Sequence, residues 1–369
     1  MSRRAAFQDV LNHKTPDRVI LDLDGCPLSG MESGSRQKLM AFLGYKGYKS
    51  ITGYGIDERI LQMLDIDTRG VGYILKPEKS VYHRLSDTSY IDEWGVKRQF
   101  TGRYWDITES PLENAHIDEL GTFRWPEPES ISKIDLKKIE QNAKYLFEET
   151  DYIVCASHPV YGIFELGCWM CGFEDFMLKM AIEPEFVHRF FEIILNYQKR
   201  VIEMYYDKIG KYIHYTSSGD DFATQSSTMI SPAMFDNLIK PYYRERIAYT
   251  KQFTDAPYLH HSCGNIYGIL QSFIDCGVDI LNPIQPCSED MQPENLKRTF
   301  GNRIVFHGGL DTQELLPNGN EEEIHNAVNK LLTCMMPQGG YIFAAAHNIQ
   351  DDVPAENIVA MFRTARDFC

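Results

Sequence analysis

From residue 151 onward, short β-type runs alternate with longer helical patterns, and this alternation limits the fold more than any other feature of the chain. In 184–209, for example, apolar residues recur at the spacing of one helix face. Helical connections between short apolar strands indicate a parallel sheet. The expected strands lie at 152–156, 212–216, 257–261, 279–281, 303–307 and 341–345, and the expected helices at 173–180, 184–209, 232–254 (with a kink at Pro241), 266–276, 293–300, 321–335 and 355–368.

Both a closed barrel and an open doubly wound sheet fit this alternation. Polar residues follow nearly every expected strand, as the active-site mouth of a barrel requires, whereas an open sheet concentrates them at one switch point. The sequence contains neither the glycine-rich turn of a dinucleotide-binding fold nor a P-loop. We therefore predict a (β/α)8 TIM barrel.

The first 150 residues are less regular, and they predict an N-terminal extension. Trp94, Tyr104 and Trp105 lie among short β-type runs, which indicates a small antiparallel β-meander that packs aromatic rings. We expect a single domain over 1–369, with the extension and meander in 1–150 and the core β/α units in 151–369. The expected elements of the extension are a helix at 4–12, a strand at 19–24, strand-like runs at 71–75, 80–85 and 88–95, and a helix at 134–150.

The charge of the chain excludes several classes of partner. Lys and Arg number 37 against 52 Asp and Glu, which gives a formal net charge of −15. A strongly acidic chain repels phosphate backbones and anionic lipid surfaces, so neither nucleic acid nor a membrane is an expected partner. The N-terminus does not have the apolar core of a signal peptide, no apolar run reaches bilayer length, and the nine cysteines are scattered. These features predict a cytoplasmic protein.

His261 and Cys263 form the strongest candidate site. In an extended segment, residues two apart point to the same side, so both side chains can reach one point in the barrel mouth. Imidazole and thiolate are ligands that zinc favours, and three protein ligands with an open fourth position define a catalytic zinc site. His347, after the last expected strand, is the candidate third ligand. The alternative is that the His-x-Cys spacing occurs by chance.

Three carboxylates are candidates for catalysis. Asp220 and Asp221 follow an expected strand on a glycine-led loop and could act as general acid and base or accept a substrate hydrogen bond. Glu165 lies where a β/α loop enters the mouth and could reach metal or substrate. The alternatives are a helix N-cap or a solvated loop for the aspartates, and a carboxylate at a helix N-terminus for Glu165.

A further group of polar side chains follows other expected strands and could bind a polar substrate. Any one of the amides in this group could instead cap a loop. The candidate substrate-binding residues are Asn282, Gln285, His307, Asp311 and Gln313.

Several motifs together resemble the uroporphyrinogen decarboxylase-like superfamily. They are 219–225 (GDDFATQ), 261–264 (HSCG), 277–286 (GVDILNPIQP), 308–313 (GGLDTQ) and the segment around His347, and the resemblance is densest from about 150 to the end. It implies a (β/α)8 barrel with the site at its C-terminal mouth. The family's decarboxylases resemble one another in an arginine-rich N-terminal stretch, but here 18–30 contains Asp22 and Asp24 and no basic residue after Arg18.

The better resemblance is to the zinc-dependent, corrinoid-linked methyltransferases of this superfamily, in particular the methyltransferase components of O-demethylase systems. It implies zinc on His261 and Cys263, a small methylated substrate, and a corrinoid (cobalamin) carried by a partner protein; it is also compatible with a homodimer. The family pattern has a later cysteine where this chain has His347, which is a departure at the third ligand. The resemblance predicts methyl transfer, with a methyl ether as the expected donor.

Two other functions remain open at this point. A cofactor-free decarboxylase of the uroporphyrinogen type would bind no metal and release CO2. A non-catalytic barrel would bind a methylated molecule or a corrinoid protein without turnover. Metal content and product formation distinguish the three.

Overall fold

The computed structural model describes residues 2–102 and 104–368, and its centre is a seven-stranded parallel sheet. The strands run in the order β1-β6-β7-β8-β9-β10-β11, which is their order along the chain. This is the succession of strand–helix units that the sequence predicts. The strands are β1 (Thr68–Val71), β6 (Ile153–Ser157), β7 (Tyr215–Gly219), β8 (Tyr258–His261), β9 (Ile280–Asn282), β10 (Val305–His307) and β11 (Tyr341–Ile342).

A segment near the N-terminus closes this sheet into a barrel. Leu21 forms a parallel bridge with Phe343, just beyond β11, and the N–H of Asp67, just before β1, donates to the carbonyl oxygen of Leu21 (3.0 Å). The region in which a strand was predicted at 19–24 thus lies between the two edges of the sheet. The predicted (β/α)8 barrel is confirmed. Two segments of its wall, the one around Leu21 and β1, come from the first 150 residues.

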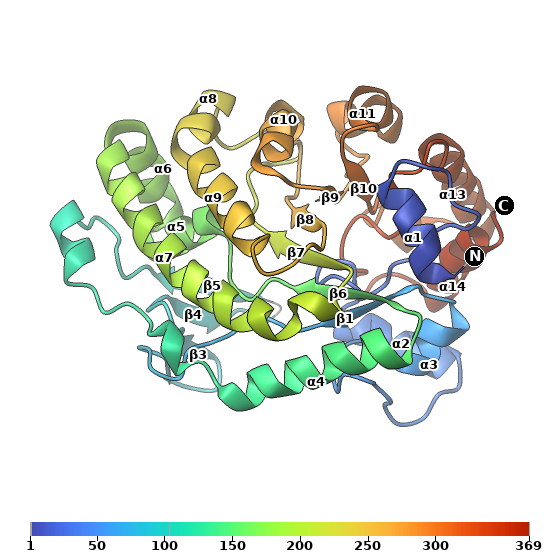
Figure 1. Cartoon of the computed structure of the whole chain (residues 1–369), viewed down its shortest axis with the longest axis horizontal. Coiled ribbons are helices and arrows are strands. Elements are labelled where there is room, and N and C mark those ends of the chain that lie inside the picture. The colour runs from blue at the N-terminus through green and yellow to red at the C-terminus, as the bar shows by residue number, and fades with distance from the viewer. Residues whose placement is uncertain (1, 103, 369) are drawn as a thin grey trace.

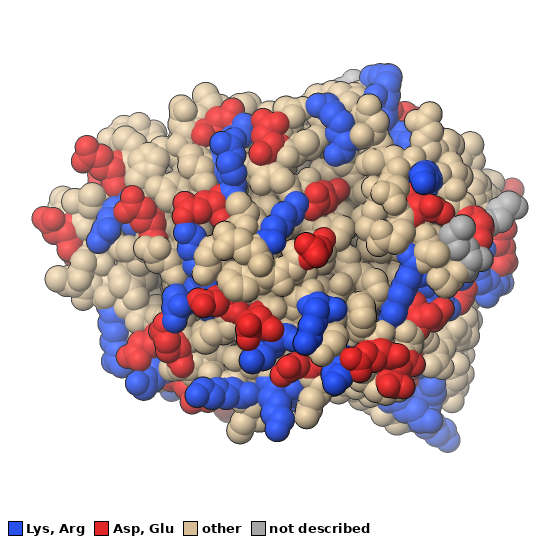
Figure 2. Space-filling view, in the orientation of Figure 1, with Lys and Arg blue, Asp and Glu red and all other residues tan. Residues whose placement is uncertain are grey.

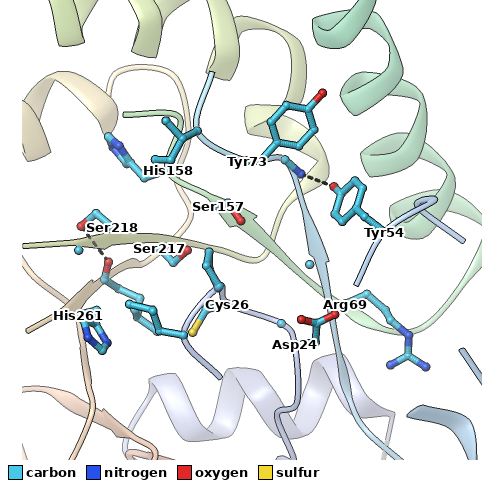
Figure 3. A pocket seen from close by; sticks show the side chains of 18 of the residues that line it. Asp24, Cys26, Tyr54, Arg69, Tyr73, Ser157, His158, Ser217, Ser218 and His261 are labelled. Carbon is cyan, nitrogen blue, oxygen red and sulfur yellow. Dashed lines mark hydrogen bonds between the residues drawn. The ribbon is translucent and has the colours of Figure 1, made fainter. Parts of the chain in front are cut away.

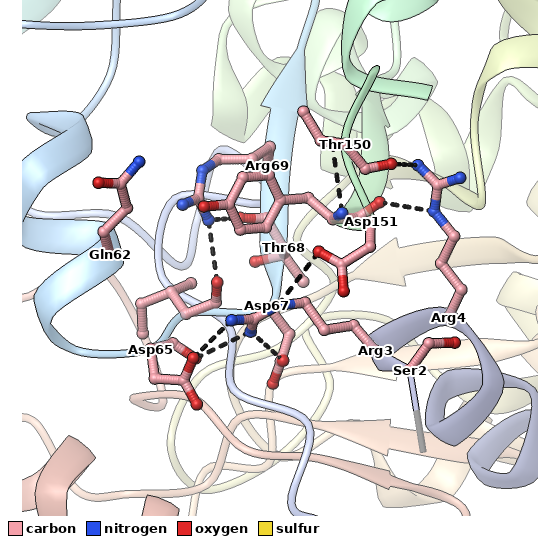
Figure 4. Close-up of polar contacts among 12 residues, drawn as sticks. Ser2, Arg3, Arg4, Gln62, Asp65, Asp67, Thr68, Arg69, Thr150 and Asp151 are labelled. Carbon is pink, nitrogen blue, oxygen red and sulfur yellow. Dashed lines mark hydrogen bonds and ion pairs between the residues drawn. The ribbon is translucent and has the colours of Figure 1, made fainter. Parts of the chain in front are cut away.

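Helix α1 (Arg3–Leu11) closes the end of the barrel opposite the strand C-termini. Phe7 is fully buried and its ring lies 5.5 Å from that of Tyr215, inside the barrel. Arg3 pairs with Asp65 and Asp67, and Arg4 donates to backbone carbonyl oxygens before β6, as Figure 4 shows. Helix α1 thus closes this end of the barrel with a buried aromatic ring and surrounding polar contacts. A functional site is therefore expected at the other end, where the strands have their C-termini.

The helices surround the sheet, as in Figure 1. The longest, α7 (Pro184–Ile209), buries one face against α4 and α9, in agreement with its predicted periodicity. No helix in the described part of the chain is long and apolar enough to cross a bilayer. The others are α2 (Ser33–Phe42), α3 (Glu58–Met63), α4 (Lys133–Glu149), α5 (Ile163–Cys171), α6 (Phe173–Ile182), α8 (Pro232–Met234), α9 (Lys240–Thr250), α10 (Tyr267–Cys276), α11 (Pro293–Phe300), α12 (Leu315–Asn318), α13 (Glu321–Met335) and α14 (Ala355–Arg366), with short 3₁₀ turns at Ile117–Gly121, Pro128–Ser130, Gly210–Tyr212 and Glu289–Met291.

Two local differences from the predicted elements have clear causes. The helix predicted at 232–254 contains a π-helical turn, Phe235–Ile239, because Pro241 has no N–H to donate to the preceding turn. The strand predicted at 212–216 is β7 (Tyr215–Gly219), since the 3₁₀ turn Gly210–Tyr212 extends α7 first. The shift by three residues puts Asp220 directly after the strand.

The predicted meander is present, but one of its expected strands belongs elsewhere. Of the run predicted at 71–75, only Val71 lies in a strand, and it is the last residue of β1 in the barrel sheet. Four antiparallel strands follow and lie beside α5, with Trp105 against Tyr90 (4.9 Å between ring centroids). They are β2 (His83–Arg84), β3 (Ser89–Ile91), β4 (Lys97–Phe100) and β5 (Trp105–Glu109).

The molecular surface carries both signs of charge. Figure 2 shows basic and acidic side chains interspersed on the face it presents, without a broad basic patch. This distribution agrees with the excess of acidic residues and offers no electrostatic footprint for a phosphate backbone on that face.

Candidate active site

The strand ends bring the three predicted metal ligands together. In the parallel register, Gly219 lies beside His261 and His261 beside Asn282. His261 Nε2 is 3.2 Å from Cys263 Sγ, and the ring of His347 is 5.7 Å from that of His261. One ligand atom from each of His261, Cys263 and His347 lies within 4.8 Å of the others. This convergence of two imidazoles and a thiol is what a zinc ion requires.

A buried hydrogen-bond chain stands behind His261. The Nδ1 atom of His261 contacts Asn282 Oδ1. Asn282 Nδ2 in turn lies 2.6 Å from His307 Nδ1, and His307 Nε2 lies 2.6 Å from Asp22 Oδ2. Asp22, Asn282 and His307 are all 0% exposed. This hydrogen-bond chain thus runs from Asp22, in the segment that closes the barrel, to the predicted ligand His261. Its two middle members, Asn282 and His307, were predicted to bind substrate.

The donors in this chain can be assigned from its acidic end. The Asp22 carboxylate only accepts, so His307 carries its proton on Nε2 and accepts on Nδ1 from the Asn282 amide. The amide oxygen of Asn282 then accepts from His261 Nδ1–H. His261 is therefore left with its Nε2 lone pair facing Cys263 and His347, which is the tautomer that binds a metal.

The pKa values of the chain support this assignment. Although burial raises the pKa of Asp22, its hydrogen bonds with His307 and Thr68 hold that pKa below its ordinary value. Burial lowers the pKa of His261 to about 4, so its imidazole is neutral at pH 7. Burial also raises the pKa of Cys26, beside Asp22, to about 12. A second group of side chains also converges like metal ligands, namely Asp22, Cys26 and His307. Its carboxylate is already engaged, because Asp22 accepts hydrogen bonds from His307, Gly25 and Thr68.

Asp220 and Asp221 have different surroundings. Asp220 is buried and accepts from the backbone N–H groups of Phe164 (2.9 Å) and Glu165 (2.8 Å) and from the hydroxyl of Tyr243 (2.6 Å). It holds the first turn of α5 in place. Asp221 is half-exposed; its Oδ1 accepts from the N–H of Cys263 (2.7 Å) and lies 3.7 Å from His261 Nε2. Of the two aspartates, Asp221 is the one beside the candidate ligands.

Glu165 lies on the first turn of α5 and faces the same space as Asp221. Burial, together with the charges of Asp220 and Asp221, raises the pKa of Glu165 well above its ordinary value. A carboxyl group with a raised pKa in a cleft is suited to proton transfer.

A cavity of about 550 Å³ opens in front of these groups, and Figure 3 shows part of its lining. Asp221, Glu165, His261 and His347 form one side of it. The remaining wall is largely apolar and aromatic, and it comes from the N-terminal segments and from α5. Its aromatic members are Tyr54, Tyr73, Tyr161 and Trp169, with His158 among them.

None of the five predicted substrate-binding residues lines this cavity, since Asn282 and His307 stand behind His261 and the other three lie elsewhere. Gln285, Asp311 and Gln313 line a separate hollow of about 260 Å³ on the other side of His347. Gln285 Oε1 accepts from the N–H of Gly264 (2.8 Å), behind Cys263, and Asp311 accepts from three backbone N–H groups before α12. These contacts support loops rather than reach into the large cavity.

Sequence reasoning missed His158 and the aromatic wall. His158 follows β6 as the other polar groups follow their strands, so its position was a usable signal. Tyr54 and Tyr73 come from irregular segments, where no periodicity indicates which side chains meet.

Comparison with known proteins adds a family and a fold relative. Residues 107–368 match the family model of uroporphyrinogen decarboxylase (URO-D). The methylated-thiol–coenzyme M methyltransferase of Methanosarcina mazei is 25% identical over 212 residues, which are 55% of this chain and 51% of that protein. The chain thus spans about half the length of this curated relative. A solved methyltransferase from Methanosarcina mazei has a TM-score of 0.66 at 14% identity, over 100% of this chain and 99% of that one.

Proposed function

The chain belongs to the uroporphyrinogen decarboxylase (URO-D) family, and within that family we propose that it is a metal-dependent methyltransferase rather than a decarboxylase. In this proposal it moves a methyl group from a small methylated compound, most simply a methyl ether, to a corrinoid carried by a partner protein. The observation that carries the proposal is the convergence of His261, Cys263 and His347, of which the two histidines line the large cavity. The methyltransferase relative supports the same choice.

The residues present fit a zinc ion by their chemistry. Two neutral imidazoles and a thiol supply three ligand atoms, and the hydrogen bond from Nδ1 of His261 leaves its Nε2 free to bind. A zinc ion held there supplies a Lewis acid that makes the heteroatom bearing the methyl group a better leaving group. The substitution of His347 for the family's cysteine keeps a ligand that zinc accepts.

The other residues of the site bind, orient and handle protons. Asp221 fixes the backbone of Cys263 through a 2.7 Å hydrogen bond and so sets the direction of the thiol. Asp220 fixes the N-terminus of α5 and thereby places Glu165 at the cavity wall. Glu165, with its raised pKa, is the group that would donate a proton to the demethylated product as it leaves.

The charges around the cavity count against a decarboxylase of a polycarboxylate. Such a substrate needs unpaired cations, and Arg69 is the one Lys or Arg among the cavity residues of the described chain. Its guanidinium is already paired with both carboxylate oxygens of Glu58 (3.0 and 2.8 Å). No other basic side chain lines the cavity in that part of the molecule.

Elemental analysis of the purified full-length protein tests the proposal. We expect about one zinc per chain in the wild type and a loss of zinc in His261→Ala. Gln313→Ala, at an exposed side chain of the separate hollow, is the matched control and should retain zinc. A wild-type protein that binds no zinc when zinc is supplied would overturn the metal-dependent mechanism.

A further inference from the structure

We infer that the methyl donor carries no negative charge and has a body about the size of a benzene ring, so that this cavity discriminates against carboxylate and sulfonate donors. This inference deepens the proposed function and rests on it. It is carried by the charge balance, the aromatic wall and the unpartnered ring of His158, all in the same cavity.

The lining offers an anionic ligand no free cation. Asp24 and Asp221 line the cavity, and neither forms an ion pair with a Lys or Arg within the described residues. The one basic group, Arg69, is paired with Glu58 and lies beside Asp24, on the opposite side of the pocket from His261 in Figure 3. A ligand carboxylate on the side of the pocket away from the candidate metal ligands would therefore lie next to Asp24 and find no free cation.

Arg69 cannot turn toward a ligand without losing several contacts. Besides its two bonds to Glu58, its Nη1 donates to the carbonyl oxygens of Ile66 (3.0 Å) and Thr68 (2.7 Å), and its guanidinium lies 3.7 Å from the ring centre of Tyr152. The side chain is 4% exposed. Its charge is thus committed to holding α3 against β1, and it does not serve as an anion receptor.

The apolar part of the wall presents aromatic rings to the cavity. Tyr54 and Tyr73 meet edge to face at 5.9 Å, and Tyr161 and Trp169 do so at 5.1 Å. Both pairs line the cavity. Aromatic rings favour edge or offset contacts with another ring, so the wall suits an aromatic donor.

His158 adds a neutral polar contact. It is 3% exposed and lines the cavity, and neither of its ring nitrogens has a hydrogen bond of normal geometry in the described residues, apart from a weak contact with the backbone of Val160. Burial and the nearby charge of Arg246 lower the pKa of His158 well below its ordinary value, so the ring is neutral. A buried neutral imidazole can bind a ligand hydroxyl or ether oxygen without contributing a counter-charge.

Three donors of matched size test the inference: 4-methoxybenzyl alcohol, 4-methoxybenzylamine and 4-methoxybenzoate. Calorimetric titration into zinc-loaded full-length protein measures their affinities, independently of any turnover. We expect the alcohol and the amine to bind on the order of 10–100-fold more tightly than the benzoate, because a like charge in a partly desolvated site is unfavourable. In Asp24→Asn, which removes the unpaired aspartate of the lining on the side of the pocket away from His261, the gap should narrow.

Two results would overturn the inference. One is benzoate binding as tight as that of the alcohol, and the other is no measurable binding of the alcohol and amine. Failure of the proposed function is a separate result: donors that bind with the expected order while the protein contains no zinc and transfers no methyl group to cob(I)alamin.

Discussion

The hydrogen-bond chain behind His261 predicts that Asp22→Asn weakens metal binding from a distance. Asparagine cannot accept from His307 Nε2–H and keep its other oxygen contacts, because one carboxylate oxygen becomes an NH2 group. His307 is then expected to move its proton to Nδ1, and the Asn282 amide to turn over. That places an NH2 group against His261 Nδ1, so the His261 proton moves to Nε2, the atom that faces Cys263.

The expected loss of zinc affinity follows from the orienting role of the hydrogen-bond chain and from its burial. Groups that orient a metal-binding histidine typically change metal affinity by about 10–100-fold when they are replaced. This range corresponds to roughly 1.4–2.8 kcal/mol of binding free energy. Since all three members of the chain are 0% exposed, water cannot easily replace the lost acceptor, and we expect the upper half of the range.

Competition for zinc against a chromophoric chelator measures the affinity, and the visible spectrum of the cobalt-substituted protein reports the ligand set. Asp22→Asn should bind zinc more weakly and show an altered cobalt spectrum. Asp24→Asn, which changes a half-buried aspartate outside the hydrogen-bond chain, should keep wild-type values. Wild-type affinity and an unchanged spectrum in a folded Asp22→Asn protein would refute the tautomer argument.

Three further predictions concern the ligands, α5 and pH. His347→Cys should retain zinc and His347→Ala should bind it more weakly, by about 10-fold or more, in the same chelator assay; equal affinities would remove His347 from the ligand set. Asp220→Asn should lower the free energy of unfolding by about 1–3 kcal/mol in urea, because a buried acceptor of three hydrogen bonds is weakened; an unchanged midpoint would contradict this role. Burial raises the pKa of Asp24 to about 6, so the folded state holds this proton more tightly than the unfolded chain and the wild type loses stability as the pH rises from about 4 to 6. Asp24→Asn lacks that loss and should therefore gain roughly 1–3 kcal/mol relative to wild type between pH 4.5 and 7.5, and a stability difference independent of pH would contradict the assignment.

The sequence allows the barrel to be predicted because periodicity is a local property. Strand β8 and helix α7 were both placed within a few residues from apolar spacing alone. The closure at Leu21 is a pairing between the two ends of the chain, and spacing carries no information about such a contact. For the same reason, 71–75 was expected in the meander although its first residue ends the barrel strand β1.

The candidate site also combines features that the sequence predicts with features that depend on distant contacts. His261 ends β8 and Cys263 follows two residues later, and the period of two predicts directly that their side chains meet. Whether Asn282 and His307 face the substrate or support His261 depends on what lies behind them, namely Asp22, which is 285 residues from His307 in the chain. The aromatic wall comes from loops and from α5, so its assembly depends on tertiary packing.

The most direct test of the central claim is methyl transfer itself. The full-length protein, stripped of metal with a chelator and then reloaded with zinc, is mixed with an aryl methyl ether and cob(I)alamin, and the formation of methylcobalamin is followed by its absorbance. The account predicts methylcobalamin formation that depends on zinc and is abolished in Cys263→Ala. Equal rates from the stripped, reloaded and Cys263→Ala proteins would contradict it.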